Sequence, residues 1–537
     1  MIAPLAPDYR ELTTHVSRCM AAGRLTDAEP ALLEITRLNP KEHFAWGLLA
    51  RIAVERGEAE VAVELIRRAL DADRKNADYH NLLGVAYGEL GRYDDALIAL
   101  RRSLRERPAS AEAHYNIGKV LEKRRELAGA RDAFSRAAAL DPRYPGARYM
   151  HARALLHLGE VDAAARELER ALADDPDDPW LVDHYGKAVS ATRGHEAAIE
   201  FLAVAAARLP GSAMVRRSYA VALLAAGRFR EGWREYLARG VTGESPRSEL
   251  PALLASDLRG ARVLLRSEQG LGDVIFFLRF LPVLLDRGAS VSLLAPRKLV
   301  PLLARSGWFI EIHEDGPATA LPAADRVLYL GDLPAAVGAD DARPPIRLAP
   351  STARVAEWRR RLAAFGSPPY RGVTWRAGTD FRQEREFGRD IRALFKEIDV
   401  ALLGRTLRGR AGTLVSVQRA PLPGEVGALA AASGLPVFDA AAMNDDLEDA
   451  LALLDVLDDY VGVSNTNTHL RAALGKTGKV LVTFPPEWRW LAAGGESPWF
   501  PGFRVYRQTP QRSWDAALAQ LAADCPLVTG VPRSGGG

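Results

Sequence analysis

The sequence predicts an α-helical solenoid over residues 1–240, followed by two α/β domains with parallel sheets. Three observations carry this prediction: a 34-residue repeat, short apolar segments that alternate with helical patterns, and a glycine turn where the first pattern gives way to the second. With 537 residues the chain is too long for a single hydrophobic core, so two or three domains are expected.

Small residues recur in register every 34 positions, counted in blocks from residue 9, and position 8 of most blocks is Ala or Gly. Alanine stands at position 20 in six blocks, namely Ala28, Ala62, Ala96, Ala130, Ala164 and Ala198. Proline stands at position 32 in five blocks, namely Pro40, Pro108, Pro142, Pro176 and Pro210. Small side chains let paired antiparallel helices approach closely, and proline ends the second helix of each pair. The pattern resembles the tetratricopeptide repeat, whose stacked helix pairs form a concave groove.

This groove predicts a protein or peptide partner. A spacer or a dimerisation surface, and with it a homo-oligomer, is the alternative. At the end of the array Phe229, Trp233 and Tyr236 have helical spacing, and we expect them to seal the last repeat against the next domain. Residues 241–258 are rich in Gly, Ser and Pro, which predicts a short linker.

Short apolar segments after the linker are predicted to be strands. Four lie in residues 259–350 (Val263–Arg266, Val291–Ala295, Phe309–His313 and Val327–Leu330), and six lie in residues 351–530 (Arg371–Trp375, Thr413–Gln418, Pro436–Asp439, Asp459–Val463, Lys479–Phe484 and Phe503–Tyr506). Helical patterns at residues 390–402, 423–433, 445–457, 468–474 and 513–524 alternate with the second group. This alternation is typical of parallel sheets that are buried on both faces. We therefore predict one domain over 259–350, a second over 351–530, and a disordered tail at 531–537.

A strand, a glycine turn and a helix follow one another at the start of the first α/β domain. The predicted strand Val263–Arg266 precedes Gly270 and Gly272, and an apolar run of helical spacing begins at Val274. Such a turn presents backbone N–H groups and a helix N-terminus to an anionic ligand. Asp273 lies at the start of this helix, where it either faces a ligand or serves as a first-turn residue that suits the helix dipole.

The composition narrows the class of protein. The 71 basic and 68 acidic residues give a net charge of +3, so a large nucleic-acid interface is not indicated. The two cysteines, Cys19 and Cys525, lie far apart, and no apolar run approaches about 18 residues. These features predict a cytoplasmic protein without a membrane span. No His/Cys cluster has zinc spacing, and no acidic pair follows a strand as a sugar-diphosphate metal motif would, so we expect no metal.

Several segments of the second half resemble a known family. They are Glu268–Pro282, Glu487–Trp490, Ser497–Pro501 and Arg504–Gln508, and they are similar to segments of bacterial tetratricopeptide-repeat glycosyltransferases, whose catalytic part resembles the heptosyltransferases. The resemblance implies the GT-B fold, in which two Rossmann-like domains face each other, with the acceptor side at 259–350 and the nucleotide-sugar side at 351–530. It also implies that Asp273 is the general base, since inverting transfer needs a carboxylate that deprotonates the acceptor hydroxyl.

The resemblance further implies a donor site that includes the Gly270–Gly272 turn and a polar segment of the last domain. This segment follows a predicted strand and consists of Ser464, Asn465, Thr466, Asn467, Thr468 and His469. Its polar groups and helix N-terminus suit the donor diphosphate, and His469 is expected to neutralise charge on the leaving group. Related enzymes usually have Asp where this chain has Ser464, and a plain helix cap would explain the same composition.

Further residues complete the expected donor site. Arg376, Arg382 and Arg385 follow the strand that ends at Trp375, where related enzymes place a basic residue, and guanidinium groups bind phosphate oxygens in a bidentate manner. A solvated charged loop is the alternative for these arginines. Gln418 is a candidate for contact with the base or ribose, and Trp488 for a wall of the pocket, although both residue types also serve structural roles at such positions.

We therefore expect a metal-independent, inverting glycosyltransferase with no cofactor, which takes a sugar from a nucleotide-diphosphate donor. The repeats would capture a protein acceptor, and flagellin or another surface protein fits the resemblance. A non-catalytic repeat scaffold with a degenerate glycosyltransferase-like domain is the alternative, and Ser464 is the feature in its favour.

Overall fold

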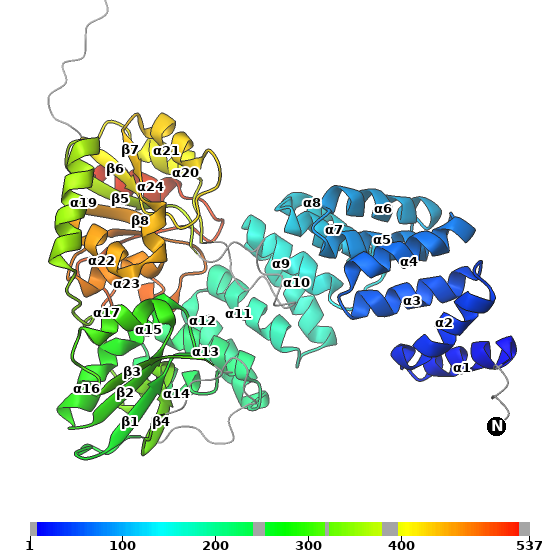
Figure 1. The fold of residues 1–537 in the computed structure, drawn as a ribbon, viewed down its shortest axis with the longest axis horizontal. Helices are drawn as coiled ribbons and strands as arrows, with labels where there is room; N and C mark the ends of the chain where they lie inside the picture. Colours follow the sequence, from blue (N-terminus) through cyan, green and yellow to red (C-terminus); the bar gives the residue numbers. More distant parts are fainter. Residues whose placement is uncertain (1–7, 240–252, 317–321, 378–395, 526–537) are drawn as a thin grey trace, which may run out of the picture. The chain divides into compact units, whose positions relative to one another are not determined.

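The computed structural model describes residues 8–239, 253–316, 322–377 and 396–525. The chain forms two compact units, Met1–Pro176 and Asp177–Gly537 (Figure 1). In the described residues, the first unit contains helices only, and the second contains further helices and two sheets.

Paired helices build the first unit. They are α1 (Tyr9–Ala21), η1 (Leu25–Ala28), α2 (Glu29–Leu38), α3 (His43–Glu55), α4 (Ala59–Ala72), α5 (Ala77–Glu89), α6 (Tyr93–Glu106), α7 (Ala111–Lys123), α8 (Leu127–Leu140), α9 (Ala147–Leu158) and α10 (Val161–Asp174). The six alanines at block position 20 are at most 2% exposed, as close helix pairing requires. At position 8, a Cβ on Gly118 would lie 2.5 Å from the Phe134 ring, so only glycine permits this approach. The proline at position 32 follows the helix end, as Pro108 follows α6.

Two more helix pairs open the second unit. They are α11 (Pro179–Arg193), α12 (His195–Arg208), α13 (Ala213–Ala225) and α14 (Phe229–Tyr236). Helices therefore continue to the predicted end of the array, but the division between compact units falls earlier, at Pro176. The reason is that α13 and α14 pack on elements of the α/β region.

The first sheet has four parallel strands in the order β3-β2-β1-β4. They are β1 (Arg262–Arg266), β2 (Ser290–Ala295), β3 (Glu311–Glu314) and β4 (Arg326–Tyr329). Short helices connect them: α15 (Leu271–Phe277), η2 (Leu278–Phe280), α16 (Leu281–Asp286), η3 (Arg297–Leu299), α17 (Val300–Ala304), η4 (Leu330–Asp332) and α18 (Leu333–Ala336).

The second sheet has six parallel strands in the order β10-β9-β8-β5-β6-β7. They are β5 (Tyr370–Thr374), β6 (Thr413–Ser416), β7 (Val437–Asp439), β8 (Asp459–Val463), β9 (Lys479–Val482) and β10 (Arg504–Arg507). Its helices are α19 (Thr352–Phe365), α20 (Val400–Thr406), α21 (Glu425–Ser433), η5 (Ala441–Asp445), α22 (Leu447–Val456), α23 (Thr466–Ala473), η6 (Trp488–Trp490) and α24 (Asp515–Ala523).

Every predicted strand is present, and its ends lie within two residues of the prediction. The α19 helix lies outside the predicted helices, although Val355, Trp358 and Leu362 on it are buried at helical spacing. The prolines that precede α19 make that stretch of sequence irregular, which hides the periodicity. Of the helix predicted at 390–402, residues 390–395 lie outside the described residues, and α20 begins only at Val400.

The second part of the predicted linker is attached to the first sheet's domain. The Leu254 N–H donates to the carbonyl of Ala336 (2.8 Å), and the Leu258 N–H donates to that of Arg287 (2.7 Å). The rest of the linker, up to residue 252, and the predicted tail at 531–537 lie outside the described residues. Among the helices in the described part of the chain, none has the length and apolar character needed to cross a membrane.

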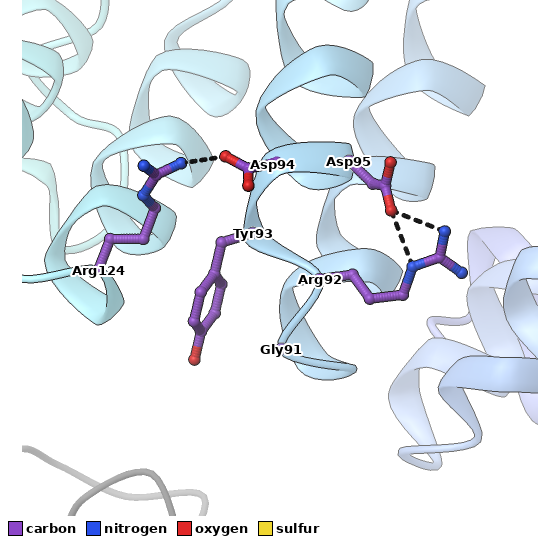
Figure 2. Close-up of a pocket in the computed structure, with 6 residues that line it drawn as sticks. All are labelled: Gly91, Arg92, Tyr93, Asp94, Asp95 and Arg124. Carbon is purple, nitrogen blue, oxygen red and sulfur yellow. Dashed lines mark hydrogen bonds and ion pairs between the residues drawn. The ribbon is translucent and has the colours of Figure 1, made fainter. Parts of the chain in front are cut away.

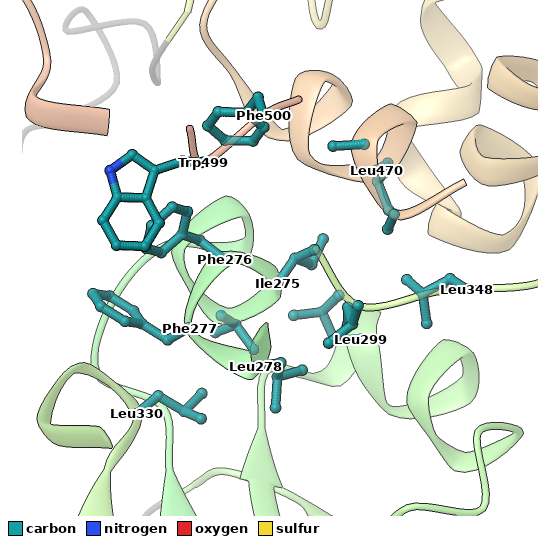
Figure 3. Close-up of a cluster of buried hydrophobic side chains, with 14 of the residues drawn as sticks. Ile275, Phe276, Phe277, Leu278, Leu299, Leu330, Leu348, Leu470, Trp499 and Phe500 are labelled. Carbon is teal, nitrogen blue, oxygen red and sulfur yellow. The ribbon is translucent and has the colours of Figure 1, made fainter. Parts of the chain in front are cut away.

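The helix that follows β1 packs against the helix that follows β8. Figure 3 shows the apolar side chains at this contact, where Ile275 and Phe276 of α15 lie beside Leu470 of α23 and the Trp499 and Phe500 rings. The loops that leave the carboxyl ends of these two strands are therefore brought together, and they carry most of the candidate site.

Candidate functional site

Asp273 lies in the first turn of α15, directly after the glycine turn. Gly270 is the N-cap residue of this helix, with an extended backbone, and no side-chain cap is present. The Oδ1 atom of Asp273 accepts a hydrogen bond from Nη2 of Arg489, in the η6 segment that follows β9. About 30% of the Asp273 side chain is exposed, against 6% for Arg489. Asp273 is therefore the partner in this ion pair that a ligand can reach.

Arg489 continues the pairing into the second sheet's domain. Its Nη1 atom lies 2.6 Å from Oε1 of Glu487, and Oε2 of Glu487 lies 2.7 Å from Nζ of Lys396. Ser464 directly follows β8, and its hydroxyl donates to the same Oε2 atom at 3.1 Å. Burial alone would raise the pKa of the Glu487 carboxyl, but Lys396 and Arg489 outweigh it and hold that pKa below its usual range. We call Asp273, Arg489, Glu487 and Lys396 the ion network; its two positive and two negative charges balance.

The polar segment after β8 forms the N-terminus of α23. Asn465 caps the helix, because its Oδ1 accepts from the Thr468 N–H (3.3 Å) while the Thr468 hydroxyl accepts from the Asn465 N–H. Asn467 donates to the carbonyl of Val417 (3.0 Å). Thr466 is half-buried at the first helical position. Much of this segment's polarity thus stabilises the helix start, as the plain cap interpretation expects.

His469 is buried beneath the glycine turn. Its ring packs edge-on against Phe276 and Phe500, with centroids 6.1 and 5.3 Å away. A Cβ on Gly272 would lie 2.9 Å from the His469 ring, so the turn can lie this close only because residue 272 is glycine. Burial and the neighbouring Arg489 hold the pKa of His469 well below its usual range, which keeps the imidazole neutral.

Neutral burial of His469 predicts a loss of stability in mild acid. The unfolded chain binds a proton at this histidine near pH 6.5 and the folded chain does not, so the free energy of unfolding should fall as the pH drops below about 6.5. Between pH 7 and pH 5 the contribution is about 2 kcal/mol. Urea denaturation at both pH values should give a smaller pH effect for His469→Gln than for the wild-type chain. His313→Gln, at an exposed histidine, is the control and should retain the full effect; equal pH effects in all three proteins would contradict the prediction.

The other predicted donor residues lie near the ends of β5 and β6. Arg376 pairs with both oxygens of Glu425 (2.7 and 3.1 Å). Gln418 is 3% exposed, and its Oε1 accepts from the backbone N–H groups of Trp375 and Arg376. The side chain of Gln418 therefore fixes the backbone at the exit of β5. Arg382 and Arg385 lie outside the described residues.

Trp488 lies in the aromatic core, with only 5% of its surface exposed. It packs edge-on against Phe276, Trp233 and Trp499. The structure thus brings Gly272, Ser464, His469 and Trp488 together around Asp273 and its ion network. Arg376 and Gln418 instead make their contacts near the ends of β5 and β6. Among the described residues, no group of three or more His, Cys, Asp or Glu side chains is placed to hold a metal ion.

Sequence reasoning missed three members of the ion network. Glu487 and Arg489 alternate with Trp488 and Trp490 in a short segment after a buried strand, and charged residues in such a setting are a usable signal of a buried ion pair. The segment entered the prediction for its resemblance and for Trp488 as a wall of the pocket, without a role for either charge. Lys396 carries no comparable signal, because it lies far from both residues in the sequence.

A separate hollow of about 390 Å³ lies in the first unit (Figure 2). It is lined by Gly91, Arg92, Tyr93, Asp94, Asp95 and Arg124. Arg92 pairs with Asp95 and Arg124 pairs with Asp94, so the charges at this hollow satisfy one another.

Comparison with known proteins supports the repeats and a relationship over most of the chain. A family model described as tetratricopeptide repeat matches residues 81–145, and another with that description matches residues 20–85 and 123–180. The chain therefore contains tetratricopeptide repeats, as predicted. Protein FlbA of Caulobacter vibrioides is 27% identical over 507 residues, which cover 89% of this chain and 77% of FlbA.

Among solved structures, repeat proteins are similar to part of the chain. The type IV pilus biogenesis factor PilW is 22% identical, with 39% of this chain and 98% of PilW covered and a TM-score of 0.35. YrrB, a repeat protein with an unusual peptide-binding site, is also 22% identical, with 34% of this chain and 95% of YrrB covered and a TM-score of 0.30.

Proposed function

We propose that this chain is an inverting glycosyltransferase that moves a sugar from a nucleotide-diphosphate donor to a protein acceptor held by the repeats. The observation that carries the proposal is the meeting of two strand-end loops from two parallel sheets around one accessible carboxylate, Asp273. Ligands of open α/β sheets bind at the carboxyl ends of the strands, and a reaction between two substrates suits a site that two sheets share. In this proposal the two sheets are the halves of a GT-B enzyme.

The chemistry assigns Asp273 the role of general base. Its carboxylate takes the proton from an acceptor hydroxyl, the hydroxyl oxygen forms a bond to the anomeric carbon, and the bond from that carbon to the diphosphate breaks. The nucleoside diphosphate leaves with the electron pair of the broken bond. Arg489 holds Asp273 in place through the bond to Oδ1, which leaves Oδ2 for the acceptor.

The leaving diphosphate needs positive groups or N–H donors. In the described residues, the start of α23 and the ammonium group of Lys396, whose side chain is 38% exposed, are candidates on the second sheet's side. Because the ion network is neutral as it stands, an anionic donor must either compete with Glu487 for Lys396 or recruit further cations.

This charge balance favours a second candidate function, a repeat scaffold whose glycosyltransferase-like region has lost catalysis. Arg489 and Lys396 in the ion network, and nearby Arg376, are already paired with carboxylates. Ser464 stands where related enzymes have Asp, and its hydroxyl is bonded to Glu487.

A nucleotide-binding measurement separates the two candidates. A thermal-shift screen of nucleoside diphosphates should identify one that stabilises the chain by about 2.7 kcal/mol at 100 times its dissociation constant. The matching nucleoside and inorganic pyrophosphate are the controls, and each should stabilise the chain less because it fills half of the site. If no nucleotide stabilises the chain at millimolar concentration, the transferase proposal is wrong and the scaffold remains.

A further inference from the structure

The last repeat helix and the turn that follows it present three large side chains to the α/β region. Trp233 and Tyr236 lie in the last turn of α14, and Arg239 follows in the turn after the helix; all three are at most 6% exposed. Residues three apart on a helix, such as Trp233 and Tyr236, share one face. These side chains are directed at the α/β region rather than at solvent.

Arg239 is the centre of a buried ion cluster. Its Nη2 atom lies 2.5 Å from Oε1 of Glu268, and its Nη1 atom lies 2.9 Å from Oδ1 of Asp332. The Gly331 N–H donates to the same Glu268 oxygen at 3.2 Å. A Cβ on Gly331 would lie 2.5 Å from Arg239 Nη2, so the backbone after β4 closes directly over the cluster. Removing one partner of such a buried pair leaves an uncompensated charge, which is strongly destabilising.

Tyr236 contacts Gln269, the residue that follows Glu268. Nε2 of Gln269 donates to the Tyr236 phenol oxygen at 3.1 Å, and it also donates to Oε1 of Glu268 at 3.1 Å. Two consecutive residues, Glu268 and Gln269, are thus bound by Arg239 and Tyr236, from the turn after α14 and from the end of α14. They directly precede Gly270, whose carbonyl accepts from the N–H groups of Asp273 (2.9 Å) and Val274 (3.1 Å).

The same region of the array also contacts the second sheet's domain. The Ala492 N–H donates to the carbonyl of Ala225, at the end of α13 (2.8 Å). The Trp233 ring lies 5.2 Å from the Trp488 ring, which neighbours Arg489, the partner of Asp273. The repeat helices are therefore linked to the Asp273 carboxylate in two ways. They contact the turn Glu268–Asp273, which carries Asp273, and they contact Trp488, the neighbour of Arg489, which binds the carboxylate.

We propose that the last repeat is a structural part of the site: Tyr236 and Arg239 are positioning residues that set the Glu268–Asp273 turn. The repeat array is then more than a tethered acceptor-binding module, because its last helix fixes the conformation of the turn. The placement of the turn does not depend on the reaction; the consequence for catalysis rests on the transferase proposal.

Tyr236→Phe tests the proposal with the smallest possible change. It removes the hydroxyl group but keeps the ring that packs on Phe277. Hydrogen exchange of the full chain should be about three- to tenfold faster at the amides of Asp273 and Val274, because the hydrogen bonding between Tyr236 and Gln269 that holds the turn is lost. The amides of β8 should exchange as in the wild-type chain.

Tyr219→Phe is the matched control. Tyr219 lies on the neighbouring helix α13, close to the charged side chains of Arg228 and Glu231. This variant should leave exchange at Asp273 and Val274 unchanged. A purely global effect of Tyr236→Phe, with equal acceleration in the turn and in β8, would contradict a positioning role, and so would no change at the turn.

Arg239→Lys gives a second measurement. Lysine keeps the positive charge but cannot bind Glu268 and Asp332 with separate nitrogens of a planar group, so we expect faster exchange at the same two amides. Hydrogen exchange is measured without a sugar donor or an acceptor substrate. Unchanged exchange at the two amides in Arg239→Lys therefore overturns the positioning proposal alone. Failure to bind any nucleotide overturns the transferase proposal alone.

Discussion

Replacing Trp233 by alanine should lower the free energy of unfolding of the Asp177–Gly537 unit by about 3–5 kcal/mol. The side chain is 1% exposed and is surrounded by five aromatic rings, those of Tyr236, Phe277, Phe280, Trp488 and Trp499. These rings come from the last repeat and from the domains of both sheets. The cavity left by alanine would therefore open where three parts of the unit meet, and none of them can close it without moving away from another.

The measurement is the urea dependence of hydrogen exchange in β1 and β8, one strand from each sheet. Trp46→Ala is the control, since Trp46 is only half-buried on α3, where Arg68 lies 4.9 Å from its ring. That variant should cost about 1 kcal/mol and leave both strands unaffected. A loss below about 1 kcal/mol for Trp233→Ala would mean that the repeats and the α/β region are stabilised independently.

Shortened chains offer an independent measurement of how much the last repeat helices contribute to the stability of the Asp177–Gly537 unit. A fragment that begins at residue 177 retains α11–α14 and should fold. A fragment that begins at residue 241, the predicted linker, lacks α14 and leaves Glu268 and Asp332 without Arg239. We expect it to aggregate or to lack cooperative unfolding, because it exposes apolar rings and two buried carboxylates.

The sequence predicts most of the fold because the fold depends on periodic signals. The 34-residue recurrence of Ala62, Ala96 and their equivalents reflects a packing constraint that repeats with each helix pair. The central strands, such as β2, β5 and β8, are buried on both faces, so their apolar runs mark them even without alternation. The boundary between compact units could not be predicted in this way. This boundary depends on which surface α13 and α14 contact. The aromatic spacing at Phe229, Trp233 and Tyr236 indicates that the array contacts the next domain, but not how many repeat helices join that domain's compact unit.

The candidate site is less predictable because its contacts join segments far apart in the chain. Asp273 and His469 follow strands, and strand ends of a parallel sheet are the positions where sequence reasoning looks for ligand-binding groups. Arg489 and Lys396 join the site only through side-chain reach across the fold. Gln418 shows a different difficulty: a polar residue at a strand end suits either a ligand or a structural role, and in the structure its carboxamide binds the backbone of Trp375 and Arg376.

Replacing Asp273 by asparagine should lower the rate of sugar transfer by about 10²- to 10⁴-fold, the range that general-base groups contribute. Asparagine has nearly the same shape, and its Oδ1 can still accept from Arg489, so the α15 turn and the packing around it should persist. The nucleotide that stabilises the wild-type chain should stabilise this variant equally, because the base acts on the acceptor. The measurement is product formation with the identified donor, alongside the thermal shift of the same protein.

Asp315→Asn is the matched control for this substitution. Asp315 follows β3 in the same sheet, its side chain is 24% exposed, and it has an arginine partner in Arg266 (3.9 Å). Loss of a comparable carboxylate there should leave transfer unchanged, since Asp315 has no contact with Arg489 among the described interactions. Transfer that is unaffected by Asp273→Asn would remove Asp273 from the role of base but leave a transferase. Nucleotide binding without any turnover by the wild-type chain would instead favour the scaffold, in which the Asp273–Arg489 pair serves only to join the two domains.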